Sequence, residues 1–192
     1  MIDDELRQAD KLIKNFKNEI KLNNRFFPHH DLYKIFDALI NNYCKIIPKG
    51  TTLYRGRLNP FKIKKPFSVK EMGKPDSDIV TNNRANPPGI NYLYLADDVD
   101  TVIAELRPNK NCFITIAQFE TQKEINIIEL SDALPSLEID DKTFSFGINL
   151  GIEFSKTVDT NRSLLEYLPT QYFAEYCKSK RLDGIKYLSS VT

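Results

Sequence analysis

The run from residue 84 to residue 108 constrains this chain most, because a rigid turn, a strand and a helix follow one another within it. The turn is predicted at Asn86-Pro87-Pro88-Gly89, where the prolines fix φ and the glycine permits a backbone conformation that other residues avoid. Residues 92–96, Tyr-Leu-Tyr-Leu-Ala, are aromatic and aliphatic and predict a strand. The run therefore indicates a fold that mixes helices and strands.

A helix is predicted to follow this strand, with Asp97 or Asp98 as its N-cap. Glu105 lies inside that helix, Tyr94 lies in the strand, and Arg84 precedes the turn. A guanidinium binds phosphate oxygens bidentately, an aromatic ring offers a stacking surface, and a carboxylate accepts hydrogen bonds from hydroxyl groups. Together these three residue types are suited to holding a dinucleotide.

The same run carries a family resemblance. The pattern R-x-N-P-P-G-x-x-Y-L-Y-L-A-D-D, followed by T-x-x-A-E-x-R-P, resembles the core signature of the RES domain family. This family is named for an arginine, a glutamate and a serine, and it includes NAD-degrading toxins of bacterial toxin–antitoxin modules. By position, the resemblance assigns the arginine to Arg84, a tyrosine to Tyr94 and the glutamate to Glu105.

Two later segments extend the resemblance, which covers roughly residues 50 to 190. The segment D-G-I-K-Y-L-S resembles the family's closing D-G-I-x-Y-x-S, which assigns the serine to Ser189, with Ser190 as the alternative. The segment L-P-T-Q-Y-F-A-E resembles the family's P-T-Q-x-x-A-E helix. Thr170 is predicted to cap that helix, and Gln171 is a candidate substrate-binding residue, with capping or packing as the alternative for both.

The fold that the resemblance implies is α+β and related to ADP-ribosyltransferases, with a mixed, partly barrel-like β-sheet and flanking helices. In such folds an arginine of the first strand commonly faces the dinucleotide. The segment Leu53-Tyr54-Arg55-Gly56 resembles that strand, so Arg55 and Tyr54 are candidate substrate-binding residues.

The activity that the resemblance implies is cleavage of the nicotinamide–ribose bond of NAD, by hydrolysis or phosphorolysis, with growth inhibition through NAD depletion. That bond breaks through an oxocarbenium-like state, so the site must fix the dinucleotide and stabilise positive charge. Arg84 would bind the pyrophosphate and Glu105 a ribose hydroxyl. Tyr94 would stack on the nicotinamide or donate its hydroxyl, and Ser189 would bond the carboxamide or a phosphate oxygen. No cofactor is expected, since NAD is the substrate, with inorganic phosphate as co-substrate if cleavage is phosphorolytic.

Other functions stay open at this stage. An ADP-ribosyltransferase would form the same oxocarbenium and transfer the ADP-ribosyl group to a protein or nucleic acid acceptor. A noncatalytic module with the same fold would bind a nucleotide or a protein. The partners that the resemblance implies are NAD and a neutralising antitoxin protein. Sequence leaves the oligomeric state open, a homo-oligomer included.

Charge and hydropathy bear on nucleic-acid binding and on cellular location. The chain has 192 residues with 27 basic and 26 acidic side chains, a formal net charge of +1, so no global field recruits nucleic acid. Apolar stretches are interrupted by polar residues within a few positions, and the start MIDDELRQAD lacks the apolar segment of a signal peptide. We therefore expect a cytoplasmic protein without a membrane span. Cys44, Cys112 and Cys177 are scattered, which favours reduced thiols.

The first part of the chain has its own character. Apolar residues recur at helical spacing over residues 6–20 and 32–40, which predicts two amphipathic helices whose apolar stripes pack on the core or receive a partner. His29 and His30 between them are expected at an exposed helix start. We divide the chain into a helical extension, residues 1–47, and a RES domain, residues 48–192. The sequence ends soon after Ser189, so it does not decide whether a further segment covers this serine in a longer chain.

The remaining elements form the scaffold. Strands are predicted over residues 51–57, 112–119, 125–130 and 184–188, and helices over residues 144–158 and from Pro169 onward. Residues 59–83 lack sustained periodicity and are predicted to form a long loop that leads to Arg84 as a wall or lid over the ligand.

Overall fold

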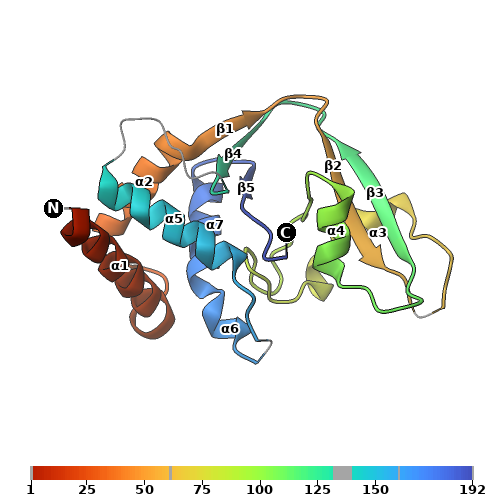
Figure 1. Ribbon diagram of the computed structural model, residues 1–192, viewed down its shortest axis with the longest axis horizontal. Helices are drawn as coiled ribbons and strands as arrows, with labels where there is room; N and C mark the ends of the chain where they lie inside the picture. Colours follow the sequence, from red (N-terminus) through yellow and green to blue (C-terminus); the bar gives the residue numbers. More distant parts are fainter. Residues whose placement is uncertain (1, 61, 132–139, 160, 192) are drawn as a thin grey trace. The chain divides into compact units, whose positions relative to one another are not determined.

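The computed structural model describes residues 2–60, 62–131, 140–159 and 161–191, with the backbone alone for residues 2–9 (Figure 1). The described helices are α1 (Ile2–Asn18), α2 (Asp31–Tyr43), α3 (Val69–Met72), α4 (Val99–Leu106), α5 (Asp141–Ser155), α6 (Ser163–Glu166) and α7 (Leu168–Ser179). The described strands are β1 (Cys44–Ile47), β2 (Thr52–Leu58), β3 (Ile114–Glu120), β4 (Ile125–Glu129) and β5 (Gly184–Lys186). Two short irregular helices, η1 (Glu19–Asn23) and η2 (Ser77–Ile79), complete the list.

The chain folds into two compact units, each assembled from separate stretches. Unit 1 comprises Met1–Ile46, Asn82–Pro87 and Asn126–Leu188, and unit 2 comprises Ile47–Thr81, Pro88–Ile125 and Ser189–Thr192. Helices and strands occur in both, so the predicted α+β class is confirmed. One sheet has the order β1-β4-β5 and the other pairs β2 with β3, and the described strands do not close into a barrel.

Unit 1 is mainly helical, and its helices meet around aromatic side chains. Phe16 of α1 and Phe36 of α2 are buried, with ring centroids 5.4 Å apart in an edge-to-face arrangement. Phe36 also packs edge to face on Phe173 of α7, at 5.0 Å, and its ring centroid lies 6.0 Å from that of Phe146 on α5. One aromatic cluster therefore joins the two N-terminal helices α1 and α2 to α5 and α7, which come much later in the sequence.

The two N-terminal helices belong to this core. Their apolar stripes are buried, as the helical spacing predicts, at these positions: Ile13, Phe16, Ile20, Leu32, Ile35, Phe36 and Leu39. Helix α1 runs beside α5, and α2 also contacts α5 (Figure 1). The apolar stripes of these helices are therefore part of the protein core. The division of the chain after residue 47 stays a prediction.

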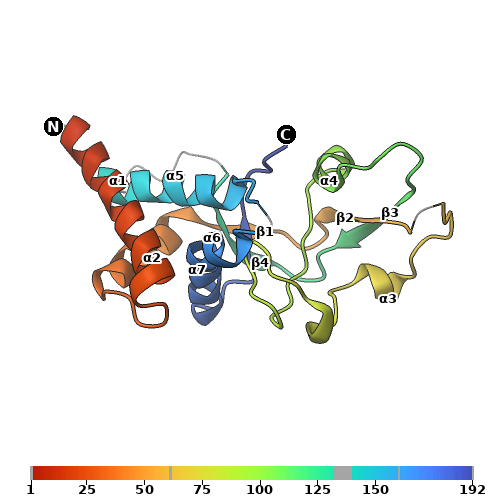
Figure 2. The same ribbon diagram turned by 90° about the horizontal axis from the view of Figure 1, so that it is seen from below.

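Unit 2 is built on the antiparallel pair β2–β3, in which Tyr54 lies opposite Gln118 and Gly56 opposite Ile116. Helices α4 and α3 lie on opposite sides of this pair (Figure 2). At the other edge of β2, Tyr54 and Ala96 exchange two backbone hydrogen bonds of 2.8 Å. The strand predicted over residues 92–96 is therefore wrong: the structure has a single bridge at Ala96 and no ladder of several residue pairs in this segment.

The other predicted elements lie close to their expected bounds. Strands β2 to β5 and helices α5 and α7 are all present, and α7 begins at Leu168, one residue before Pro169. Residues 59–83 are mostly loop, interrupted by α3 and η2. Strand β1 was not expected, because its four residues directly continue the apolar pattern of α2. Gly89 has φ +85°, which agrees with the turn that its sequence predicts.

All three cysteines are free, as their scattered positions predict. Burial raises the pKa of the Cys177 thiol to about 12, so this thiol stays protonated and unreactive.

No helix in the described part of the chain is long and apolar enough to cross a membrane.

Phe36→Ala tests the aromatic cluster. Phe36 is fully buried between three other helices, so the substitution removes a large apolar side chain and leaves a cavity. We expect a loss of about 3–5 kcal/mol in the free energy of unfolding, measured by urea denaturation with circular dichroism. Phe26, which is 75% exposed, is the matched control, and Phe26→Ala is expected to change stability by less than about 0.5 kcal/mol. Similar losses in both variants would contradict this account of the core.

A nearly buried carboxylate lies at the end of β4. Glu129, with a side chain 9% exposed, forms ion pairs with Lys45 at 2.6 Å and Lys186 at 3.2 Å. Ser131 donates a hydrogen bond of 2.9 Å to the same carboxylate. Burial alone would raise the pKa of Glu129, but these bonds outweigh burial and hold it at about 2.

This network predicts a pH-dependent contribution to stability. Because the folded pKa of Glu129 lies below its ordinary value of 4.5, the contribution is present above pH 4.5 and is lost as the pH falls toward 2. With the lysines about half exposed and partly screened, we expect roughly 1–3 kcal/mol. The measurement compares wild type with Glu129→Gln by urea denaturation between pH 7 and pH 3. A difference in stability that does not shrink with falling pH would refute the assignment.

Candidate functional site

Helix α4 carries Glu105, and its start is set by a local cap. The Asp98 carboxylate accepts hydrogen bonds of 2.7 Å from the Thr101 N–H and 2.9 Å from its hydroxyl. These bonds lower the pKa of Asp98, and they select Asp98 over Asp97 as the predicted N-cap. Glu105 lies in the last turn of the helix, with an exposed side chain.

Helix α4 approaches β2 closely because Gly56 has no side chain. A Cβ atom at Gly56 would lie 2.4 Å from Val102 Cγ1 and 2.7 Å from Leu106 Cδ1, which is closer than packed atoms allow. Val102 is buried in this contact. The small residue on the strand therefore fixes how near the helix with Glu105 lies to β2.

Glu105 is hydrogen-bonded to the serine that the family signature predicts. The Ser189 hydroxyl donates to Glu105 Oε1 at 2.5 Å, although the two residues are 84 positions apart. The Val191 N–H donates to the same hydroxyl oxygen at 3.2 Å. Both residues belong to unit 2. The structure thus brings together two of the candidate catalytic residues, and a charge-assisted bond fixes their mutual orientation.

Tyr54 and Tyr94 belong to the same unit as Glu105 and Ser189. Tyr54 is half-buried on β2, and its backbone pairs with Ala96. Tyr94 is two residues before Ala96 and is also half-buried. The bridge therefore brings the segment with Tyr94 beside Tyr54, directly before the helix that carries Glu105. Ser190, the alternative to Ser189, is half-buried in this unit as well.

Arg55 lies on the face of β2 away from α4, because side chains alternate along a strand and Gly56 faces α4. Its Nη1 donates to the carbonyl oxygens of Met72, at 3.2 Å, and Gly73 at the end of α3. Partial burial, and then the charge of Arg57, lower the pKa of Arg55, although a guanidinium stays charged. Arg55 thus holds the predicted long loop to the strand in this structure.

Arg84 and Gln171 lie in unit 1 and are described there. Arg84 is half-buried in a turn, and its Nη1 donates to the Phe154 carbonyl oxygen at 3.1 Å, in the last turn of α5. Gln171 is 4% exposed in the first turn of α7, and its side-chain nitrogen contacts the backbone on both sides of Arg84.

The role predicted for Thr170 as a helix cap is wrong. Helix α7 starts at Leu168 and has no side-chain cap, because Thr170 already lies within it. The Thr170 hydroxyl instead lies 2.6 Å from the Arg84 carbonyl oxygen and 2.9 Å from that of Tyr167. The sequence did not predict the contact between Thr170 and Arg84, nor the close approach of α4 at Gly56, because both depend on residues far away in sequence. For the Thr170 contact, the match to the P-T-Q motif was the one available signal.

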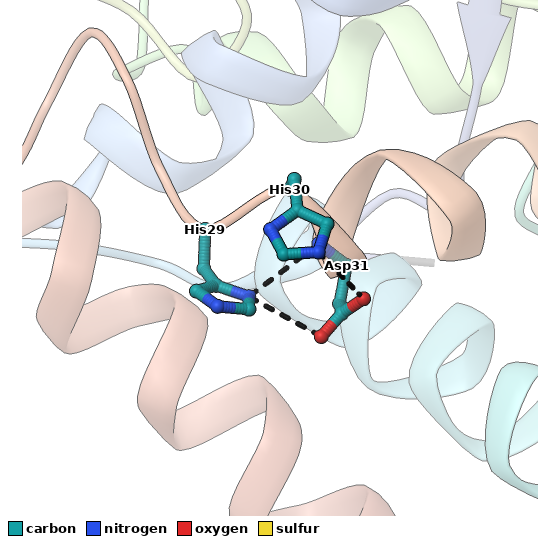
Figure 3. Close-up of side chains that lie close together, drawn as sticks. All are labelled: His29, His30 and Asp31. Carbon is teal, nitrogen blue, oxygen red and sulfur yellow. Dashed lines mark hydrogen bonds and ion pairs between the residues drawn. The ribbon is translucent and has the colours of Figure 1, made fainter.

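Another group of ligating side chains is found at the start of α2, where His29, His30 and Asp31 lie together (Figure 3). Their ligand atoms lie within 4.8 Å of one another, and Asp31 is 3.3 Å from His29 and 3.5 Å from His30. Lys34 also pairs with Asp31, and the bond from Lys34 lowers the pKa of that carboxyl. All three side chains are more than half exposed, so ordinary polar contacts at an exposed helix start account for the group.

Comparison with known proteins gives one match. A protein-family model described as the RES domain matches residues 52–192, which include all of the candidate catalytic residues. No curated protein and no solved structure matches the chain.

Gly56→Ala tests the contact between α4 and β2. Because the added Cβ overlaps Val102 and Leu106, we expect a loss of about 1–3 kcal/mol in the free energy of unfolding, measured by urea denaturation. The matched control is Gly184→Ala in β5, where a Cβ would make an ordinary contact of 3.4 Å with Ile127. An unchanged midpoint for Gly56→Ala would show that α4 does not pack as described.

Proposed function

Because this chain belongs to the RES domain family, we propose that it is an NAD-consuming enzyme that cleaves the nicotinamide–ribose bond. The observation that supports this most directly is the hydrogen bond between Glu105 and Ser189, to which the resemblance assigns the family's glutamate and serine. A carboxylate held by a hydroxyl in an exposed position is suited to a sugar ligand.

The reaction begins when the bond between the ribose carbon and the nicotinamide nitrogen breaks. The electron pair leaves with nicotinamide, whose ring becomes neutral, and the ribose carbon becomes an oxocarbenium-like centre. Water then attacks that carbon and releases a proton to give ADP-ribose, or phosphate attacks it to give ADP-ribose phosphate. The protein's task is to bind the dinucleotide and stabilise the developing positive charge.

Glu105 supplies the negative charge in this proposal. Its carboxylate accepts a hydrogen bond from a ribose hydroxyl and stabilises the oxocarbenium electrostatically. The hydroxyl proton of Ser189 is donated to Glu105, so the serine oxygen acts toward a ligand as an acceptor. It is therefore matched to the amide N–H₂ of the nicotinamide carboxamide, and a phosphate oxygen would need the hydroxyl to turn away from Glu105.

Apart from Gln171, the other predicted residues keep the roles that the resemblance implies. We propose that Arg84 binds the pyrophosphate and that Tyr94 stacks on the nicotinamide or donates its hydroxyl. Arg55 and Tyr54 are proposed to bind the dinucleotide. The bonds from Arg55 to the carbonyl oxygens of Met72 and Gly73 use its Nη1 alone, so the N–H groups of Nη2 and Nε are the donors proposed for phosphate oxygens. Gln171 is proposed to act through the Arg84 turn, and Ser190 remains the alternative to Ser189.

The biological setting is part of the same proposal. An enzyme of this kind inhibits growth by depleting NAD, and a protein antitoxin that covers or distorts its site would neutralise it. We propose an ADP-ribosyltransferase-like core, a cytoplasmic location where NAD is available, and no cofactor besides the substrate itself. A homo-oligomer is compatible with this proposal.

The test is incubation of the purified chain with NAD, with and without inorganic phosphate, followed by chromatography of nicotinamide, ADP-ribose and ADP-ribose phosphate. We expect nicotinamide release, with ADP-ribose phosphate as co-product if the enzyme is a phosphorylase. Glu105→Gln removes the charge while keeping the shape, and we expect at least a 100-fold loss of kcat/KM, on the order of 3 kcal/mol of transition-state stabilisation.

A matched control separates this role from a general charge effect. Asp100 is an exposed carboxylate on the same helix, and Asp100→Asn is expected to leave turnover within about 3-fold of wild type. Survival of NAD with folded wild-type protein would contradict the proposal. ADP-ribose attached to an added protein or nucleic acid acceptor would favour the ADP-ribosyltransferase instead. Saturable NAD binding without turnover would favour the noncatalytic module.

A further inference from the structure

The backbone around Arg84 forms a tight turn with two reciprocal hydrogen bonds. The Asn83 N–H donates to the Asn86 carbonyl at 2.9 Å, and the Asn86 N–H donates to the Asn83 carbonyl at 3.3 Å. Ala85 and Asn86 are buried, with exposed fractions of 8% and 2%. The turn therefore has a closed backbone geometry, and its carbonyl oxygens have further lone pairs that can accept hydrogen bonds, of which that of the buried Asn86 needs a donor most.

Those donors come from the first turn of α7, about 85 residues along the chain. The Gln171 side-chain nitrogen lies 2.8 Å from Asn82 Oδ1, 2.8 Å from the Asn83 carbonyl oxygen and 3.0 Å from that of Asn86. One amide group thus contacts both ends of the turn. Its two N–H groups are shared among three oxygen atoms, so the nitrogen has no capacity for another acceptor.

Thr170 contacts the centre of the same turn. Its hydroxyl lies 2.6 Å from the carbonyl oxygen of Arg84 itself. Thr170 and Gln171 are 2% and 4% exposed, so water does not replace either donor readily. The carbonyl oxygens of Asn83, Arg84 and Asn86 are therefore all oriented by neighbouring side chains of one helix.

The Arg84 side chain is oriented as well. Its Nη1 donates to the Phe154 carbonyl oxygen at 3.1 Å, near the C-terminus of α5, where the helix dipole favours positive charge. Backbone and guanidinium are thus held by two different helices of unit 1.

We propose that Thr170 and Gln171 are positioning residues that fix the turn bearing Arg84, and so place its guanidinium for the pyrophosphate of the dinucleotide. The inference rests on the proposed function for its ligand, while the anchoring of the turn stands on the hydrogen bonds alone. Neither side chain needs to touch the ligand, because both act through the backbone of Arg84.

The first test measures the anchoring without any ligand. Gln171→Met keeps the length of the side chain and removes its N–H donors, and Thr170→Val keeps the shape and removes the hydroxyl. We expect faster amide hydrogen exchange at Asn83 and Asn86 in Gln171→Met, and unchanged exchange in Ser179→Ala, a control at the other end of α7. Unchanged exchange at the turn in a folded Gln171→Met protein would overturn the anchoring.

The second test is a double-mutant cycle on NAD turnover. In the wild-type background, Gln171→Met is expected to lower kcat/KM by about 10-fold to 100-fold, because a displaced binding group loses its geometry. In the Arg84→Ala background the same substitution should change kcat/KM by less than about 2-fold, since its effect passes through Arg84. Equal losses in the two backgrounds would refute positioning, because a general effect on folding acts in both.

Thr170 keeps the inference testable if Gln171→Met does not fold. Thr170→Val is expected to speed exchange at the turn and lower kcat/KM, and Thr170→Ser, which retains the hydroxyl, to recover most of that loss. Equal losses in both Thr170 variants would count against the inference. If the wild-type protein does not consume NAD, the proposed function fails, and with it the role in catalysis. The exchange measurement still decides whether the two side chains hold the turn.

Discussion

The edge-to-face contact between Phe36 and Phe173, with centroids 5.0 Å apart, supports much of unit 1. Phe173 lies on α7 two residues after Gln171, so the packing of this ring fixes the first turn of the helix that anchors Arg84. Phe36 comes from α2, which precedes the residues matched by the family model. The helices before the RES domain thus supply core packing to a helix within it.

The two units hold their signature residues in different ways. Arg84 is placed through its backbone, by donors that are almost completely buried. Glu105 is exposed, and its carboxylate is oriented by a hydroxyl that comes from the end of the chain. A buried anchor gives a rigid position, whereas an exposed carboxylate keeps lone pairs accessible from solvent. The first arrangement suits a group that must be held in place, and the second suits a fixed negative charge whose remaining lone pairs stay available to an incoming donor.

Much of this architecture follows from local sequence signals. The helices of residues 31–43 and 141–155, the cap at Asp98 and the strand of residues 52–58 agree with their patterns, because periodicity and capping act over a few neighbours. The family resemblance proposed Glu105 and Ser189, the latter with Ser190 as its alternative, and the structure joins Glu105 to Ser189 by a hydrogen bond. The strand expected at residues 92–96 was wrong, because β propensity depends on context and the segment pairs through one bridge alone, between Ala96 and Tyr54. The contacts of Thr170 and Gly56 were not predictable, since each depends on a segment far away in sequence.

The path of the chain has a consequence for how such a protein evolves. It passes between the two units at residues 46–47, 81–82, 87–88, 125–126 and 188–189, so neither unit is encoded by one continuous stretch of gene. A single recombination crossover between residues 47 and 188 therefore exchanges parts of both units together. Neither unit can be transplanted alone as a cassette, and we expect the two to share one evolutionary history.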